Sequence, residues 1–216
     1  MEKIIHQIWV GPNAMPQREQ EFVRKLQAQH PTFQHLFWYD ENMPELPDQI
    51  KAVYDYFARN GMWAMCADIL RQYVVYYYGG IYVDVDFDAV QGMESWDIEN
   101  YDGFIYHGGP GDYPLPNQFF GIKQGHPLSE YLVSKITMDN TNWYGPHWFG
   151  EHVKNYYGLP FECAVEDLEN VLSLDNFKYM FVVDVDKVMV HYGLYSWGPE
   201  NKDTYQLRSN SHPLSG

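Results

Sequence analysis

The sequence predicts an α/β fold, an open and mostly parallel twisted sheet flanked by helices, and three observations support this prediction. Residues 3–10 form an almost continuously apolar run that Gly11-Pro12 ends, as expected of a central strand buried on both faces. A helix-like and then a strand-like stretch follow, which is a β-α-β start. Further on, a long helix leads through two glycines into a strand that ends in acidic residues.

The first half of the chain alternates between helix and strand patterns. Pro16 suits the first turn of a helix, and residues 33–39 form a second strand pattern. Pro47 begins another helix, which Asn60-Gly61 ends. The apolar positions at helical spacing are Phe22, Val23 and Leu26 in the first helix and Ile50, Val53, Tyr54 and Phe57 in the second.

No glycine or proline interrupts residues 64–78, where apolar side chains recur at helical spacing. This stretch predicts an amphipathic helix of about four turns. Gly79-Gly80 ends it, because glycine adopts positive φ without a Cβ clash. In residues 81–86 aliphatic side chains alternate with one aromatic and two acidic ones, so a strand would carry the aliphatics on one face and the carboxylates on the other.

Asp84 and Asp86 are the two acids of this predicted strand. Their Cα atoms would lie about 6.6 Å apart. Two carboxylates about 4 Å apart repel by about 4 kcal/mol at an effective dielectric constant near 20. A positive group is therefore expected, and a divalent ion with oxygen ligands, Mn²⁺ or Mg²⁺, meets the need. Such ions are usually shared between carboxylates and substrate phosphates, so the motif predicts a phosphate-bearing ligand.

Asp68 and Arg71 precede this strand and share one helix face, because they are three residues apart. A guanidinium beside a bound diphosphate could donate bidentate hydrogen bonds. A nearby carboxylate could accept hydrogen bonds from sugar hydroxyls. An acid–base pair at this spacing is also commonly a weak surface contact.

Residues 67–71 and 78–86 together resemble the sugar-binding region of DXD glycosyltransferases of family 32. That group includes yeast-type mannosyltransferases and bacterial capsular polysaccharide transferases, and it is similar to the glucosyltransferase core of large clostridial toxins. Residues 4–11 resemble the opening strand of these families, and residues 191–197 resemble their closing active-site segment. The resemblance implies a single domain over residues 1–216 with the glycosyltransferase A fold, a Rossmann-like sheet. Its nucleotide-sugar-binding part would span about 1–125 and its acceptor-side part about 126–216.

The resemblance also implies the site residues. Catalysis would rest on Asp68, Arg71, Asp84 and Trp197. Trp9 would stack on the nucleotide base, and the indole N–H of Trp197 would donate to the leaving phosphate oxygen. The donor would be bound by Gln7, Ile8, Trp9, Asp68, Arg71, Tyr82, Val83, Asp84, Ser196 and Trp197. The metal would be bound by Asp84, Asp86 and His191, with Ser196 as the alternative to His191.

The expected reaction is metal-dependent transfer of a hexosyl group from a nucleotide sugar to a hydroxyl of a glycan or glycoprotein. A UDP-sugar is favoured over a GDP-sugar, and by resemblance the anomeric configuration is retained. No enzymic nucleophile emerges, so same-face attack assisted by the leaving phosphate is favoured over a covalent intermediate. Two alternatives remain: a glycoside hydrolase, since paired carboxylates also serve those enzymes, and a metal-dependent sugar or nucleotide-sugar binding module without transfer.

Composition limits the binding partners and the cellular compartment that we expect. Lys and Arg total 14 against 29 Asp and Glu, a formal charge of −15, which argues against nucleic acid or an anionic membrane. Cys66 and Cys163 are too few for a disulfide framework and suggest a reducing compartment. No signal-like start or 18-residue apolar run occurs, so we expect a soluble cytoplasmic chain or a catalytic piece of a longer protein. The sequence is silent on oligomeric state.

The second half gives weaker patterns. Residues 91–116 predict a loop region, 104–107 and 118–123 short strands, and 127–138 a helix. Residues 117–121 resemble the region that follows the DXD motif, and we expect a contact there with donor or acceptor. The aromatic residues 143–149 predict either a platform for a sugar ring or a hydrophobic lid on the sheet. His6 is expected to be a core histidine rather than a ligand. The acidic alternation at 183–186 lacks a preceding Gly-Gly turn and is interpreted as a surface feature.

Overall fold

A computed structural model of the chain describes residues 1–89, 92–107, 115–139, 144–181 and 189–191. Within these residues six strands form one sheet in the order β2-β1-β3-β6-β5-β7. β6 is antiparallel to both of its neighbours, and all other neighbouring pairs are parallel, so the predicted mostly parallel sheet is confirmed. The strands are β1 (Ile4–Ile8), β2 (Gln34–Trp38), β3 (Gly80–Val83), β5 (Gly103–His107), β6 (Phe119–Ile122) and β7 (Phe177–Phe181).

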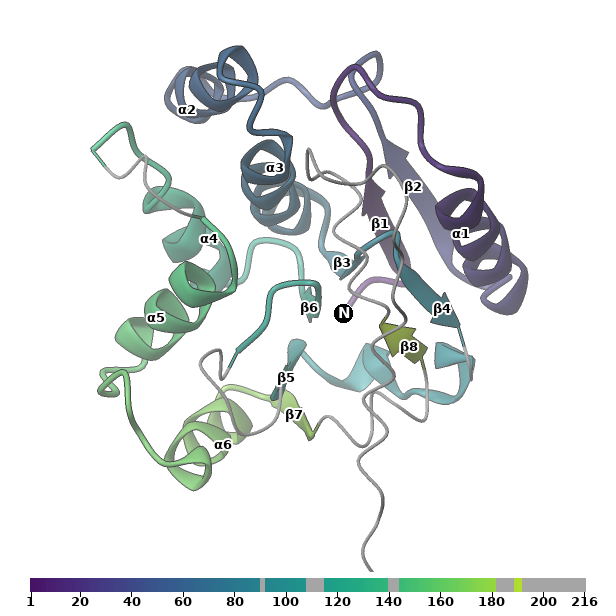
Figure 1. Cartoon of the computed structure of the whole chain (residues 1–216). Helices are drawn as coiled ribbons and strands as arrows, with labels where there is room; N and C mark the ends of the chain where they lie inside the picture. Colours follow the sequence, from purple (N-terminus) through teal and green to yellow (C-terminus); the bar gives the residue numbers. More distant parts are fainter. Residues whose placement is uncertain (90–91, 108–114, 140–143, 182–188, 192–216) are drawn as a thin grey trace, which may run out of the picture.

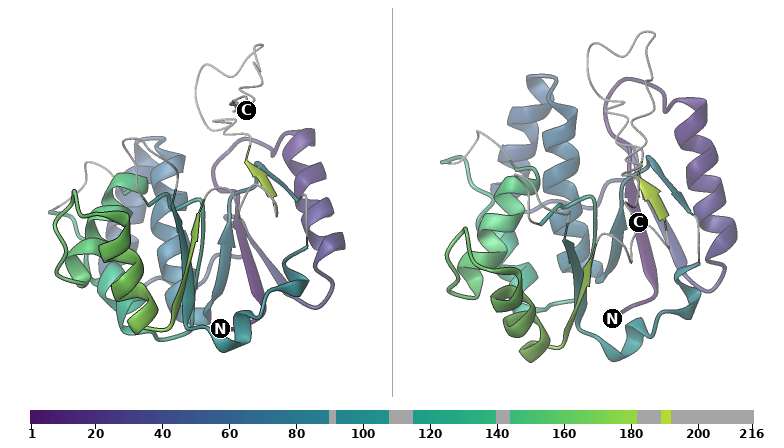
Figure 2. Two further views of the ribbon diagram at one scale, coloured as in Figure 1. Left: turned by 90° about the horizontal axis from the view of Figure 1, so that it is seen from below. Right: turned by 60° about the horizontal axis from the view of Figure 1, so that its bottom comes forward.

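Helices cover both faces of the sheet (Figure 1). One face carries α1 (Gln17–Gln29) and a separate antiparallel pair, β4 (Phe87–Ala89) with β8 (Met189–His191). The opposite face carries α2 (Asp48–Arg59), α3 (Trp63–Tyr78), α4 (Pro127–Ser134), α5 (Pro146–Tyr156) and α6 (Val165–Leu174), as Figure 2 shows. Two short 3-10 helices, η1 (Met93–Ser95) and η2 (Ile98–Asn100), precede β5.

The predicted helices are confirmed, with one shorter than expected. The helix predicted over residues 127–138 ends at Ser134, because the chain turns at Lys135 and Ile136 through backbone hydrogen bonds to Leu132 and Val133. Among the described helices, none combines the length and the apolar character needed to cross a bilayer.

Two hydrophobic clusters lie on the two faces of the sheet. Ile81 and Val83 of β3 belong to the cluster that includes Leu26 of α1, whereas Tyr82 belongs to the cluster that includes the core of α2 and α3. This alternation is the period of two that the sequence predicts for these residues. Both faces are covered, so all four residues of β3 are buried.

The prediction of an amphipathic α3 is wrong. Every residue from Asp68 to Val75 is buried, including three polar ones, because α2, α4, β1, β3 and β6 all pack against this helix. Cys66, in the same helix, is fully buried as a packing residue, and burial raises the pKa of its thiol to about 12. The polar residues buried within α3 are therefore placed inside the fold rather than on an exposed face.

His6 is confirmed as a core histidine. It is completely buried, its Nε2 lies 2.8 Å from the carbonyl oxygen of Gly79, and its Nδ1 accepts a hydrogen bond from Trp38 Nε1 at 3.1 Å. Nε2 must therefore carry the proton of a neutral ring. Burial, partly offset by the bond to Gly79, lowers the pKa of His6 to about 4.

We expect His6 to make the protein less stable in mild acid. Between pH 6.5 and about 4 the unfolded chain binds a proton at this histidine and the folded chain does not, so the free energy of unfolding falls as pH falls through this range. The full loss is about 3 kcal/mol, and no change arises from His6 above pH 6.5. Urea unfolding from pH 7.5 to 4 checks this. His6→Gln keeps one donor and one acceptor without titrating, and an equally steep acid dependence in this variant would contradict the prediction.

Candidate active site

The acidic motif lies at the carboxyl edge of the sheet, where β3 ends. The predicted strand through Asp86 is too long: β3 ends at Val83, and Asp84 to Asp86 form a turn. The turn arises because the chain leaves the main sheet to form β4, which pairs with β8 instead. The backbone N–H of Asp84 donates to Gln118 at 2.9 Å, which fixes the first acid at the sheet edge. Its side chain is 26% exposed, whereas Asp86 is buried.

Arg71 joins the two acidic positions that the sequence singles out. Its Nη2 lies 3.3 Å from Asp68 Oδ1 and 3.2 Å from Asp84 Oδ1. Its Nη1 donates to the carbonyl oxygen of Asn117 at 2.9 Å. The Arg71 and Asp68 side chains are each only 8% exposed. The predicted Asp68–Arg71 pair is thus a buried ion pair rather than a weak surface contact.

Tyr82 completes the setting of Asp84. Its hydroxyl donates to Asp84 Oδ1 at 2.5 Å, and the guanidinium carbon of Arg71 lies 4.4 Å from the centre of its ring. Burial raises the pKa of Tyr82 well above its usual value, with the nearby Asp84 acting in the same direction and Arg71 opposing it. The phenol therefore stays protonated and acts as a donor to the carboxylate.

Burial and charge set the ionisation of the central pair. Burial raises the pKa of Asp68, while Arg71 and the hydrogen bond from Asn117 oppose the rise. For Arg71, burial alone would lower the pKa, but Asp84, Tyr82 and Asp68 raise it above the ordinary value. The guanidinium is therefore a permanent positive charge beside Asp84. It supplies part of the positive charge that the neighbouring carboxylates require.

The residues fit a divalent ion in their chemistry and charge. Asp68, Asp84 and Asp86 against Arg71 leave a formal charge of −2, and hard carboxylate oxygens are the ligands that Mn²⁺ and Mg²⁺ prefer. Among the described residues, no group of three or more His, Cys, Asp or Glu side chains forms a complete metal site. An ion here would need further ligands, as expected of one shared with substrate phosphates.

The remaining predicted site residues fall into two groups. His191 ends β8, and its backbone pairs with Phe87, the residue directly after Asp86, so the topology brings it to the acidic turn. Ser196 and Trp197 lie outside the described residues, as does the acidic alternation at 183–186. The metal and donor roles predicted for these positions stay predictions.

The predicted donor-binding residues of β1 reach the same sheet edge. Trp9 follows the last residue of β1, is partly exposed, and donates from Nε1 to the carbonyl oxygen of Asn13 at 2.8 Å. Gln7 is buried, and Ile8 belongs to the core beneath α2 and α3. The side chain of Val83 is likewise buried in the core. Ile8 and Val83 could therefore contact a donor only through their backbones.

The aromatic segment at the start of α5 is part of the core in the residues that the structure describes. Tyr144 and Phe149 are completely buried and Trp148 nearly so. The Tyr144 ring meets Phe57 of α2 edge-on at 5.9 Å, and its hydroxyl bonds to the backbone of Thr137. For these three rings, the packing favours the interpretation as a hydrophobic lid on the sheet and not the one as a platform for a sugar ring.

Asn117 is a site residue that sequence reasoning did not single out. Its side-chain Nδ2 donates to Asp68 Oδ1 at 2.9 Å, in addition to the bond that its carbonyl oxygen accepts from Arg71. It lies inside the segment 117–121, which resembles the region after the DXD motif, but nothing in a single sequence separates it from its neighbours. Only the antiparallel placement of β6 beside β3 brings it to Asp68.

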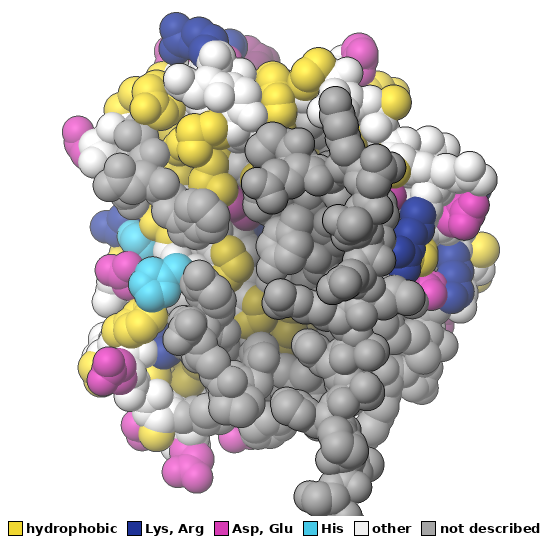
Figure 3. Space-filling view, in the orientation of Figure 1, with side chains coloured by type: hydrophobic (Ala, Val, Ile, Leu, Met, Phe, Trp, Pro, Cys, Tyr) yellow, Lys and Arg dark blue, Asp and Glu magenta, His cyan; other side chains and the backbone are white. Residues whose placement is uncertain are grey.

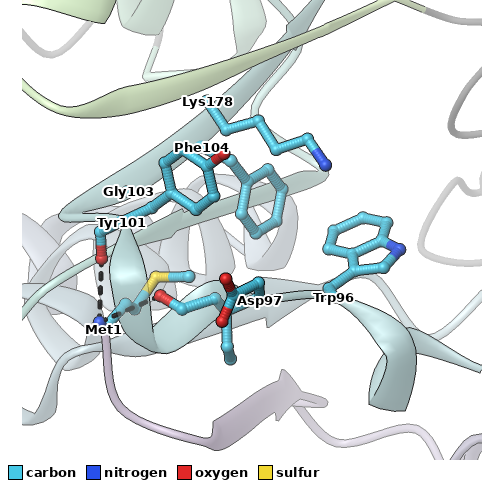
Figure 4. A pocket seen from close by; sticks show the side chains of 8 residues that line it. Met1, Trp96, Asp97, Tyr101, Gly103, Phe104 and Lys178 are labelled. Atoms are coloured by element: carbon cyan, nitrogen blue, oxygen red, sulfur yellow. Dashed lines mark hydrogen bonds between the residues drawn. The ribbon is translucent and has the colours of Figure 1, made fainter.

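A small hollow lies at the opposite, amino-terminal edge of the sheet (Figure 4). The cavity has a volume of about 10 Å³, which is enough for about one water molecule. It is lined by Met1, Trp96, Asp97, Ile98, Tyr101, Gly103, Phe104 and Lys178. None of the acidic site residues contributes to it. Figure 3 looks instead onto the carboxyl edge, where hydrophobic side chains gather over α2 and α3.

Solved structures with the same arrangement define the class of fold. The glycosyltransferase PaToxG superposes with a TM-score of 0.60 and 16% identity, over 79% of this chain and 83% of that chain. The UDP-bound glycosyltransferase domain of the YGT toxin superposes with a TM-score of 0.54 and 10% identity, over 88% and 80%. The fold is therefore the glycosyltransferase A fold that the sequence predicts.

A sequence-family match covers the segment that carries the candidate site. Residues 16–102 match the family described as "Glycosyltransferase sugar-binding region containing DXD motif". This segment includes Asp68, Arg71, Asp84 and Asp86. The resemblance to DXD glycosyltransferases is thereby confirmed.

Curated relatives come from two yeasts. Inositol phosphoceramide mannosyltransferase 3 of Schizosaccharomyces pombe is 26% identical over 149 residues, which are 67% of this chain and 40% of the relative. Mannosyl phosphorylinositol ceramide synthase CSH1 of Saccharomyces cerevisiae is also 26% identical over 149 residues, 67% of this chain and 38% of the relative. The chain thus spans about two fifths of the length of these relatives.

Proposed function

We propose that this chain transfers a hexosyl group from a nucleotide sugar to a hydroxyl of a glycan or glycoprotein, with retention of configuration and with dependence on Mn²⁺ or Mg²⁺. The observation that carries the proposal is the position of Asp84 at the carboxyl end of β3, 3.2 Å from an Arg71 that also pairs with Asp68. In open α/β sheets, ligands bind at this edge.

Asp84 and Asp86 would hold the metal, with His191 as a further ligand. When bound there, a divalent ion would supply positive charge against the negative charge of a departing nucleoside diphosphate. The donor is a UDP-sugar or a GDP-sugar. A UDP-bound neighbour of the same fold supports the first, and the mannosyltransferase names of the relatives support a hexose as the transferred group.

Arg71 would contribute to the reaction by its fixed charge, whereas a guanidinium without protein partners could donate hydrogen bonds directly to the diphosphate. Its N–H groups already face Asp68, Asp84 and the carbonyl oxygen of Asn117, so direct contact with a diphosphate would require it to exchange its contact with Asp84. In place, it supplies a fixed positive charge within the site and holds both carboxylates. Fixed charge of this kind stabilises developing negative charge without reorganisation during the reaction.

Asp68 would bind the sugar, and Trp9 the base. Asp68 is held at the floor of the site and could accept hydrogen bonds from hexose hydroxyls. Trp9 lies at the end of β1 on the same edge and would stack on the nucleotide base. Trp197 would donate to the leaving phosphate oxygen. Attack by the acceptor hydroxyl on the same face as the departing diphosphate accounts for retention without an enzymic nucleophile.

The test is release of nucleotide. The protein is incubated with a panel of UDP- and GDP-hexoses and Mn²⁺, with and without glycan acceptors, and free UDP and GDP are measured. We expect nucleotide release from at least one donor, loss of release with EDTA, and recovery with excess Mn²⁺. Binding of a nucleotide sugar without release from any donor would identify a binding module and contradict transfer.

Asp84→Asn and Asp86→Asn are each expected to reduce turnover by about 100-fold or more, because each removes a charged ligand from the metal. Asp167→Asn, an exposed acid on α6, is the matched control and should behave as the unaltered protein. Calorimetry of Mn²⁺ and nucleoside diphosphate gives a second measurement. Metal-dependent nucleotide binding that survives intact in both site variants would show that the metal lies elsewhere.

A further inference from the structure

Asn117 bonds directly to Asp68 and Arg71, and the residue after it bonds to the backbone of Asp84. Its side chain donates to Asp68 and its carbonyl oxygen accepts from Arg71, each at 2.9 Å. The carbonyl oxygen of the next residue, Gln118, accepts the backbone N–H of Asp84, also at 2.9 Å. Asn117 is 1% exposed, so this amide is a buried part of the site.

The fold gives this residue little freedom to move. β6 pairs with β3 as far as Phe119 opposite Val83, and the Asp84–Gln118 bond extends that ladder by one step. On the other side, Leu115 is completely buried, and its Cβ lies 3.3 Å from the place where a Cβ on Gly150 of α5 would stand. The segment before β6 is therefore clamped between β3 and α5.

The fixed position of Asn117 determines the contacts of the Asp68 carboxylate. Its Oδ1 accepts a hydrogen bond from the side-chain amide of Asn117 and also forms the ion pair with the guanidinium of Arg71. Its Oδ2 has no hydrogen-bond partner in the part of the chain that the structure describes, and the side chain keeps 8% of its surface exposed. One oxygen is thus fixed by the protein, and the other is available to a ligand.

We infer that Asn117 is a positioning residue for the donor sugar: it holds Asp68 in one orientation so that Oδ2 can accept a hydroxyl of the hexose. The inference rests on the proposed function. It separates two parts of the site, since the metal and diphosphate would be bound by the turn at Asp84 and Asp86, and the sugar by Asp68 as set by Asn117. An amide is suited to the task because it donates to a carboxylate without adding charge.

Two variants test the inference, each with a matched control. Asn117→Ala removes the donor, and Asn117→Asp replaces it with a second carboxylate of nearly the same shape. Asn100 makes the same kind of contact, from Nδ2 to Asp97 Oδ2 at 2.6 Å, on the exposed opposite edge, so Asn100→Ala and Asn100→Asp are the controls. Urea unfolding establishes that each variant is folded before it is assayed.

We expect both Asn117 variants to lower kcat/KM for donor hydrolysis by about 10- to 100-fold, the value of one hydrogen bond to a charged group. The affinity for nucleoside diphosphate with Mn²⁺ should stay within about threefold, because these ligands do not contact Asp68. Donor turnover within about twofold of the unaltered protein in both variants would overturn the inference. An equal loss of diphosphate affinity would also overturn it, since that indicates general disruption of the site.

Carbon-detected NMR titration of the Asp68 carboxyl gives a measurement that needs no turnover. The Asn117 bond lowers the pKa of Asp68, so the pKa should rise in Asn117→Ala and rise further in Asn117→Asp, where two carboxylates share the space. If no donor is turned over, the proposed function fails, yet this titration still measures whether Asn117 controls Asp68. An Asp68 pKa that is the same in all variants would overturn the positioning role.

Discussion

Arg71→Met is expected to lower the free energy of unfolding by about 3–5 kcal/mol and to abolish measurable donor turnover. The guanidinium is the cation of a buried pair with Asp68, and it also lies 3.2 Å from Asp84. Breaking a buried pair by removing one partner leaves an uncompensated charge, which costs this much. Turnover fails because the charge that sets both carboxylates is gone. Urea unfolding and nucleotide release measure the two effects.

Arg59→Met is the matched control, because Arg59 is exposed on α2 and, within the described part of the chain, donates only to a carbonyl oxygen of its own helix at 3.0 Å. This change should stay within about 0.5 kcal/mol. Combining Arg71→Met with Asp68→Asn should recover part of the lost stability, since the unpaired charge is then removed as well. If the double variant is no more stable than Arg71→Met alone, the Asp68–Arg71 pair does not account for the loss.

Gly80→Ala is expected to destabilise the fold by several kcal/mol, on the order of 3 or more. Gly80 has a φ of 96°, which L-residues rarely adopt, and a Cβ there would lie 2.6 Å from the backbone oxygen of Ile4. That oxygen belongs to β1, a central strand, so it cannot move without disturbing the sheet. Thermal and urea unfolding measure the loss.

Gly125→Ala separates the backbone strain at positive φ from the steric clash of the added Cβ. Gly125 also has positive φ, 67°, but a Cβ added there meets nothing within 4 Å. It should therefore cost only the backbone strain, about 1 kcal/mol. If Gly80→Ala and Gly125→Ala lose equal stability, close approach of β3 to β1 is not the reason that Gly80 is needed.

The elements that the sequence predicts well are those whose signal is local. The β-α-β start, α2 and α3 occur where apolar spacing and the prolines and glycines at their ends place them. The DXD segment is found for the same reason, because two acids after a Gly-Gly break form a short and specific pattern. The glycosyltransferase A fold then follows from the resemblance that this segment carries.

The predictions for α3 and for the end of β3 are wrong because segments that are distant in the sequence determine the burial and pairing of these elements. The amphipathic pattern expected of α3 is absent because five other elements bury it from several sides, so its polar residues face inward. The strand predicted through Asp86 ends at Val83 because β8, about one hundred residues later in the sequence, pairs with the chain after the turn. Neither partner can be deduced from the residues of the segment itself.

The sequence by itself determined which residues are candidates for the site: two acids at the end of a predicted strand, and an acid and an arginine on the preceding helix. Tertiary structure decided how they are connected. Burial turns Asp68 and Arg71 into a strong pair, the turn after Val83 brings Asp84 to that pair, and β6 delivers Asn117 to Asp68. The physical reason is that residue type and spacing are local properties, whereas burial and hydrogen-bond partners depend on segments that meet only when the chain folds.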